Sequence, residues 1–247
     1  MTNTPKCWIC GAPANSAEHR IKRSDLTRVY GKGSYKGTSA PVHVRNGVIS
    51  PIQGPNSLRV KYAQSLCHDC NTARTQPYDK AYDRLIDWVM SNEPAILQKR
   101  QLNFQEIYGL DWEEQQRDLF KYCVKSFGCR LVDAGQMVPR DLIDLLPLTS
   151  FRTALKITFA VNEDVLLMPK QDRTGFIGKG DLLATNPQGY TWCESVSWFR
   201  IHYWYFCSPD GGLGSTWIAD AQYVYLGSEA PLSPEMRADF LAKCKSS

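Results

Sequence analysis

The segment Cys67-His68-Asp69-Cys70-Asn71 decides how this chain is expected to fold, because it repeats the spacing of Cys7-Trp8-Ile9-Cys10. Two Cys-x-x-Cys pairs supply four thiolates, and four thiolates at such tight spacing can close a tetrahedral zinc site. The intervening loop of 56 residues is long, but the entropy of closing a loop grows slowly with its length. We therefore expect one structural zinc ion, held by Cys7, Cys10, Cys67 and Cys70. The alternative is two pairs of buried cysteines that never meet.

The residues on either side of the second pair indicate a helix after it and a loop before it. Pro77 suits the first turn of a helix, and apolar residues follow at helical spacing, namely Tyr82, Leu85, Ile86, Val89 and Met90. Residues 28–61 are rich in Gly, Ser, Pro and basic side chains, which is typical of a long loop. Within this loop Asn46-Gly47 favours a hairpin over residues 42–49.

The rest of the chain has a different residue pattern, typical of helices and strands rather than of a long loop. Helices are expected at about 94–107, 111–132 and 139–146, and the middle one would bury Leu119, Tyr122, Cys123, Ser126 and Phe127. Segments 154–168, 191–206 and 221–226 are rich in β-branched and aromatic residues, and Pro209-Asp210-Gly211-Gly212 indicates a turn. We therefore expect an α+β fold with a zinc-bearing domain over residues 1–92 and a helical segment and antiparallel sheet over residues 93–247.

Composition narrows the classes of protein that the chain can belong to. No run of 18 or more apolar residues is present, which excludes a membrane-spanning helix, and residues 1–6 lack the apolar core of a secretory signal. The expectation is a cytoplasmic protein whose thiols stay reduced. The five remaining cysteines lack the spacing of metal ligands and are expected to be ordinary small apolar residues: Cys123, Cys129, Cys193, Cys207 and Cys244.

Positive charge is concentrated at the N-terminal end of the chain. Residues 1–61 hold ten Lys/Arg and two acids, Glu18 and Asp25, whereas residues 62–247 hold nineteen Lys/Arg and 23 acids. A local field of this sign attracts polyanions, with nucleic acid first among them. The alternative is a solvated basic surface that binds nothing.

A closed four-cysteine site has no open coordination position, so any chemistry must lie elsewhere. Glu18-His19 offers a carboxylate oxygen for a hard cation and an imidazole that can take a proton from water near neutral pH. Adjacent residues on a strand point to opposite faces, so both can serve one site only at a strand end or a distortion.

The order of these motifs resembles the zinc-containing branch of the HNH nucleases. Cys-x-x-Cys is followed by an acid and a histidine at Glu18-His19, then by Cys-x-x-Cys-Asn ending at Asn71. The resemblance covers about residues 5–92, and similar segments running from Cys-Asn to Gln-Pro-Tyr-Asp occur in HNH effectors of bacterial anti-phage systems. It implies a ββα-metal unit of two strands and a helix around one divalent ion, and an endonuclease acting on DNA.

The resemblance also implies roles for single residues. His19 matches the general base, Glu18 the acidic metal ligand before it, and Asn71 the last family position, which is Asn in the HNH domain of CRISPR effector nucleases. The oxygen ligands Glu18 and Asn71 would favour Mg²⁺ or Mn²⁺ as the catalytic ion. The middle family Asn has no match at the usual spacing, where Tyr62, Ala63 and Gln64 stand. Gln64 or Asn56 takes that role, and the sequence does not decide between them.

Basic residues near this motif are expected to contact nucleic-acid phosphates. These are Arg20, Lys22 and Arg23 beside the motif, and Lys32, Lys36, Arg45 and Arg59 in the loop, with Tyr35 placed to stack on a base. One rival interpretation is a zinc knuckle that binds nucleic acid without cutting it. A second is an interaction protein with a purely structural zinc. Residues 93–247 are expected to position or restrain the nuclease through self-association as a homodimer, through a partner protein or through a trigger ligand.

Overall fold

The computed structural model describes residues 5–37, 40–45, 48–150, 152–185, 189–209 and 211–245. The chain divides into two compact units. Unit 1 combines Met1–Gln76 with Gly128–Val138, and unit 2 combines Pro77–Phe127 with Pro139–Ser247. This division differs from the expected boundary at residue 92, because a segment far along the chain returns to the N-terminal unit. No helix among the described residues is both long and apolar enough to cross a membrane.

Unit 1 contains short elements joined by long connections: α1 (Arg23–Tyr30), β1 (Val42–Arg45), β2 (Val48–Pro51), the 3₁₀ helix η1 (Leu58–Val60) and α2 (His68–Asn71). Helix α1 carries Asp25 in its first turn and Arg28 in its last, and each charge interacts favourably with the helix dipole at its end of the helix. The two side chains also form an ion pair at 2.6 Å. The helix ends at Gly31, whose φ of 79° lies in the left-handed region.

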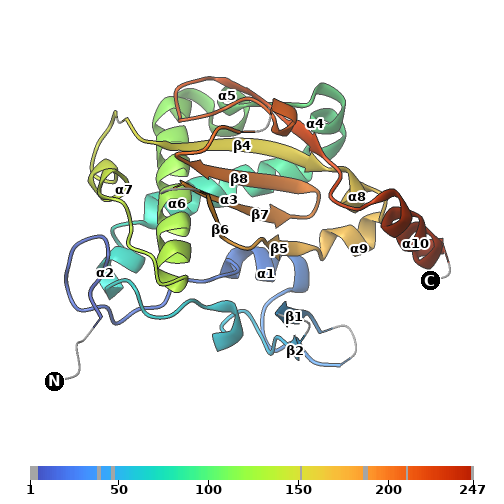
Figure 1. Cartoon of the computed structure of the whole chain (residues 1–247), viewed down its shortest axis with the longest axis horizontal. Coiled ribbons are helices and arrows are strands. Elements are labelled where there is room, and N and C mark those ends of the chain that lie inside the picture. The colour runs from blue at the N-terminus through green and yellow to red at the C-terminus, as the bar shows by residue number, and fades with distance from the viewer. Residues whose placement is uncertain are drawn as a thin grey trace. The chain divides into compact units, whose positions relative to one another are not determined.

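The predicted hairpin in the basic loop is present. Strands β1 and β2 pair antiparallel, with Val42 opposite Pro51 and Arg45 opposite Val48. The turn expected at Asn46-Gly47 lies outside the described residues. The loop is therefore not structureless, as Figure 1 shows for the two short strands that it contains.

Unit 2 is built around a six-stranded sheet with the strand order β10-β4-β8-β7-β5, and β6 also pairs with β7 (Figure 1). The strands are β4 (Leu155–Asn162), β5 (Ile177–Lys179), β6 (Leu183–Thr185), β7 (Gly189–Val196), β8 (Phe199–Tyr205) and β10 (Gly227–Glu229). The prediction of a purely antiparallel sheet is wrong at one edge, because β10 runs parallel to β4. The α+β class itself is confirmed.

Two long helices of unit 2 were predicted well. Helix α3 (Gln76–Ser91) begins beside Pro77 and buries Tyr82, Leu85, Ile86 and Val89. Helix α6 (Trp112–Asp133) buries all five of the side chains expected to face a core. Its Phe127 ring lies 5.7 Å from Tyr203 of the sheet, and Tyr122 stacks on Tyr82 of α3 at 4.1 Å. These aromatic contacts form the core of the unit.

The helix expected over residues 94–107 is wrong in its middle. Helix α4 (Glu93–Lys99) ends at Arg100, whose φ of 51° is left-handed. The chain then forms β3 (Gln101–Asn103), which pairs with β9 (Tyr223–Tyr225), before α5 (Phe104–Tyr108) begins. Local periodicity cannot reveal a strand partner some 120 residues further along the chain.

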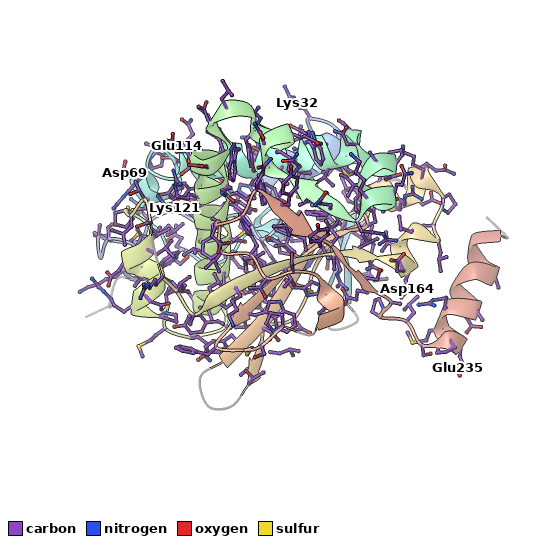
Figure 2. The ribbon with its side chains drawn as sticks, turned by 90° about the horizontal axis from the view of Figure 1, so that it is seen from above. Lys32, Asp69, Glu114, Lys121, Asp164 and Glu235 are labelled. Atoms are coloured by element: carbon purple, nitrogen blue, oxygen red, sulfur yellow. The ribbon has the colours of Figure 1, made fainter. Side chains whose placement is uncertain are left out.

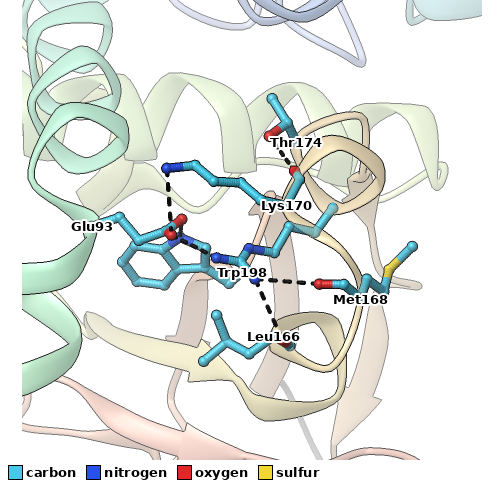
Figure 3. Close-up of polar contacts among 7 residues, drawn as sticks. Glu93, Leu166, Met168, Lys170, Thr174 and Trp198 are labelled. Carbon is cyan, nitrogen blue, oxygen red and sulfur yellow. Dashed lines mark hydrogen bonds and ion pairs between the residues drawn. The ribbon is translucent and has the colours of Figure 1, made fainter. Parts of the chain in front are cut away.

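A buried carboxylate ties the start of α4 to distant segments of unit 2 (Figure 3). One Glu93 oxygen accepts a hydrogen bond from Arg173 at 2.6 Å, and the other accepts one from the Trp198 indole at 2.7 Å. Arg173 also donates to the carbonyls of Leu166 and Met168. A charge-assisted network of this kind fixes the packing of these segments.

The remaining elements of unit 2 are the helices α7 (Arg140–Leu145), α8 (Glu163–Leu166), α9 (Lys170–Thr174) and α10 (Pro234–Lys245), with the 3₁₀ turns η2 (Gly109–Asp111) and η3 (Gly211–Leu213). Asp164, labelled in Figure 2, is buried and receives hydrogen bonds from Leu232 N and Arg237 Nε. This carboxylate therefore anchors the beginning of α10.

Candidate functional site

The two cysteine pairs meet in unit 1. The sulfur atoms of Cys7, Cys10, Cys67 and Cys70 all lie within 4.8 Å of one another. Cys10 Sγ and Cys67 Sγ are 3.6 Å apart, and a tetrahedral zinc ion with bonds of about 2.3 Å places its sulfurs about 3.8 Å apart. The residues therefore fit a zinc-like ion, and the alternative of two pairs that never meet is wrong.

Local backbone geometry turns each pair toward this point. After the first pair the chain reverses, with Gly11 N donating to Cys7 O at 2.8 Å and a φ of 76° at Gly11. In the second pair, Cys67 caps α2 through a hydrogen bond from Cys70 N to its Sγ at 3.4 Å. Asn15 Oδ1 accepts from His68 N at 2.8 Å and caps the same helix. His68 is exposed, as expected for a residue that is not a ligand.

The protonation of the sulfurs is consistent with a cation site. The backbone N–H of Cys70 lowers the pKa of the Cys67 thiol. Burial raises the pKa of the Cys70 thiol well above its ordinary value, so this sulfur ionises readily only when a cation shares the site. Arg74 Nη1 also donates to Cys70 Sγ at 3.8 Å and supplies positive charge there.

The four-cysteine cluster rests on a small core of unit 1. Tyr62, Leu66 and Cys129 pack against it, together with Trp8 and Ile9. Cys129 comes from the last turns of α6, and its neighbour Gly128 leaves room for an indole, because a Cβ there would lie 2.6 Å from the Trp8 ring. Cys129 behaves as the small apolar residue that was expected. Cys123 is also buried, Cys193 and Cys207 are half-buried, and the Cys244 side chain lies outside the described part.

Glu18 and His19 lie on an irregular antiparallel pairing. Ser16 bridges Leu66, and His19 bridges Lys61. Residues 16–19, four in number, thus lie opposite residues 61–66, six in number, which places the expected distortion at the motif. Glu18 Oε1 accepts from His19 N at 2.8 Å, so the carboxylate folds back toward the histidine.

The imidazole of His19 carries a buried nitrogen. Its Nε2 is buried and has no hydrogen-bond partner among the described residues. Burial lowers the pKa of His19 below its ordinary value of 6.5, and the charges of Lys61 and Arg23 lower it further. Glu18 and the Pro55 carbonyl oppose this shift. The net effect is a lowered pKa, which favours the neutral form of the ring.

Asn71 is oriented from the same segment. Its Nδ2 donates to Ser16 Oγ at 2.8 Å, and its Oδ1 is buried without a hydrogen-bond partner in the described part of the chain. Ser16 stands two residues before Glu18, so one hydrogen bond joins the strand of Glu18 to the helix of Asn71. A buried amide oxygen without a donor is costly unless a cation or a water occupies the site.

The two candidates for the middle family position, Gln64 and Asn56, lie in different surroundings. Gln64 is exposed and donates weakly to Asn15 O at 3.4 Å. Asn56 is also exposed, and it directly follows the buried Pro55, whose backbone raises the pKa of His19. The choice between the two residues stays open.

The basic residues expected to contact phosphate fall into two groups. Arg20 forms an ion pair with Asp133 at 3.1 Å and lies over the Tyr62 ring at 4.9 Å, so it serves the packing of unit 1. Lys22 is half-buried, whereas Arg23, Lys32, Lys36 and Arg59 are exposed, and Figure 2 shows Lys32 at the surface. Tyr35 donates to the carbonyls of Leu26 and Gly31 and anchors its loop. The Arg45 side chain lies outside the part of the chain that the structure describes.

Sequence reasoning missed the residues that orient this site. Ser16 and Pro55 carry no motif, and the Asp133 partner of Arg20 lies 113 residues away in the chain. Only the position of Ser16 two residues before Glu18 gave a usable signal.

Comparisons with known proteins add no family. No protein-family model matches the chain, and no curated protein and no solved structure matches it.

Proposed function

We propose that this chain is a metal-dependent endonuclease of the HNH type that hydrolyses phosphodiester bonds, with DNA as the expected substrate. The observation that carries the proposal is the half-buried His19 ring, which follows the Glu18 carboxylate in the chain and whose Nε2 has no partner among the described residues. A base must be neutral before it can take a proton. Burial favours the neutral form of His19, because it lowers the pKa of the imidazole.

Two further features support the proposal. Glu18, next to the base, and the buried amide of Asn71, which is bonded to Ser16 two residues before Glu18, both offer oxygens. Oxygens are the donors that Mg²⁺ or Mn²⁺ prefers. Unit 1 holds twelve Lys/Arg against four acids, whereas unit 2 holds seventeen against 21. Unit 1 therefore carries the field that attracts a polyanion.

The chain's own residues would act as follows. His19 Nε2 takes a proton from a water molecule aligned with the phosphorus. Glu18 and Asn71 would hold the divalent ion, which supplies neutralisation of the negative charge that builds on the phosphate. The exposed Arg23, Lys32 and Lys36 hold neighbouring phosphates. Because Nε2 is covered by protein in this structure, the residues that cover it must move when nucleic acid binds.

The four cysteines would hold a structural zinc in this enzyme. Cys70 and Asn71 are adjacent on α2, and Asn15 and Ser16 bind the two ends of that helix. An ion at the cysteines therefore fixes both arms of the site, although it takes no part in the reaction. We expect about one zinc per chain, retained through purification.

The deciding experiment is digestion of plasmid, linear duplex, single-stranded DNA and RNA with Mg²⁺ or Mn²⁺. The wild type should cut, and His19→Ala should lose at least about 100-fold in rate, since general-base catalysis contributes about 10²–10⁴. His68→Ala is the matched control, because it removes an exposed imidazole and should cut normally.

Two results would contradict the nuclease proposal. Tight binding of nucleic acid without cutting in any metal would identify a zinc-knuckle binding protein instead. Absence of both binding at low salt and cutting would leave an interaction protein with a structural metal.

A further inference from the structure

Lys61 is the residue directly opposite His19. The two form an antiparallel bridge, flanked by hydrogen bonds from Tyr62 N to Glu18 O at 2.9 Å and from Arg20 N to Val60 O at 2.6 Å. Hydrogen bonds between the flanking residues define a non-hydrogen-bonded pair, in which the two Cα atoms approach to about 4.5 Å and the side chains lie closest. The side chains of His19 and Lys61 therefore project on the same side of the pairing.

The ammonium group of Lys61 has no counter-ion among the residues that the structure describes. It forms no ion pair and no side-chain hydrogen bond with any residue that the structure describes, although it is only half-exposed. Nearby arginines differ, since Arg20 pairs with Asp133 and Arg28 with Asp25. A charge left uncompensated beside a half-buried base disfavours folding unless an anion arrives to share the site.

A phosphodiester is the anion that suits this position. In the proposed reaction the water oxygen bonds to phosphorus while His19 takes the water proton. The bond from phosphorus to the leaving sugar oxygen breaks, its electron pair stays on that oxygen, and solvent supplies the proton. Negative charge builds on the non-bridging oxygens throughout, and a fixed cation within reach of them stabilises this charge.

We propose that Lys61 is a catalytic residue that binds a non-bridging oxygen of the phosphate under attack. The inference rests on the proposed nuclease function. It differs from the role expected for Lys32 and Lys36, because Lys61 contacts the phosphate that reacts and the loop lysines contact its neighbours. Lys61 acts by its charge and exchanges no proton with substrate.

The test compares Lys61→Gln and Lys61→Arg with Lys80→Gln, which removes the same charge from an exposed position on α3. The rate of cutting is measured with saturating duplex and Mg²⁺. Binding is measured separately in a His19→Ala background, over a range of salt. Zinc content and melting temperature are recorded for each variant.

We expect Lys61→Gln to lower kcat by about 10²–10³, the loss typical of one donor to a developing oxyanion. Binding should weaken only about threefold, and the slope of log K against log salt should fall by about 0.9, as for one phosphate contact. Lys61→Arg should recover most of the rate, and Lys80→Gln should match the wild type.

Each other result has a definite meaning. Wild-type cutting with an unchanged kcat in Lys61→Gln would overturn the inference and leave the nuclease standing. A loss confined to binding would make Lys61 an ordinary backbone contact. Loss of zinc or of the melting transition in both Lys61 variants would show a structural role. Failure of the wild type to cut would instead overturn the nuclease proposal itself.

Discussion

The protonation of His19 couples the candidate site to the stability of the chain. Burial holds its pKa below the ordinary 6.5 in the folded state, whereas the unfolded chain keeps a value of about 6.5. The unfolded state therefore binds more protons in the window below about pH 6.5. The stability tied to a neutral His19 is fully present above that pH and is lost as pH falls through the folded pKa.

This linkage gives a prediction at the level of one residue. The free energy of unfolding of the wild type should fall more steeply between about pH 7 and pH 5 than that of His19→Asn, which has no such proton to gain. Urea denaturation at a series of pH values measures both slopes. Equal slopes in the wild type and His19→Asn would show that burial of the ring does not depress its pKa.

At the level of elements, the end of α6 is shaped to receive the indole of Trp8. A helical glycine is normally destabilising, so Gly128→Ala would by propensity alone stabilise α6 by about 1 kcal/mol. Here the added Cβ would lie 2.6 Å and 2.7 Å from two Trp8 ring carbons. The ring must move, and it belongs to the spacer of the first cysteine pair.

We therefore predict that Gly128→Ala does not stabilise the helix, as a Gly→Ala change in a helix usually does. It should lower the free energy of unfolding by about 1–3 kcal/mol, as overpacking does. Zinc should also be lost to a chelator faster than in the wild type. Adding Trp8→Leu to Gly128→Ala should recover part of the stability, because the obstructing ring is gone. Stabilisation by Gly128→Ala alone would mean that Trp8 moves aside without cost.

At the level of the whole molecule, the N-terminal unit is not continuous in sequence. Residues Gly128–Val138 belong to unit 1, where Cys129 packs on the cysteine cluster and Asp133 neutralises Arg20. A fragment of residues 1–92 lacks both Cys129 and Asp133. It should be insoluble or poor in zinc, because it leaves an uncompensated arginine and an open core.

Metal analysis and circular dichroism of that fragment test the prediction. Full-length Asp133→Ala is the control, and it should lose part of the stability while retaining zinc. A fragment that folds, binds zinc and cuts like the full chain would contradict the unit boundaries. If the fragment does not fold, the cause is its missing core residues, and the result says nothing about regulation by residues 93–247.

The sequence predicted what depends on local spacing. The two Cys-x-x-Cys pairs, α3 and the buried stripe of α6 follow from intervals of three and four residues. The sequence did not predict contacts between residues that are distant in the chain. The strand of Gln101–Asn103, the parallel edge strand β10 and the Arg20–Asp133 pair all depend on contacts that no local pattern encodes. The orienting contacts of Ser16 and Pro55 belong to this second class.

The cysteine cluster draws its ligands from both sides of a long basic loop, which has a consequence for a broken chain. With an ion bound, Cys7 and Cys10 are fastened to Cys67 and Cys70, so the loop between them becomes a closed ring. A protease that cleaves after the exposed Lys32 or Lys36 opens this ring without releasing either piece. Under native conditions the two fragments would stay associated, and a chelator would cause them to dissociate. The bound metal would thus act as a covalent-like cross-link between the two ends of the loop.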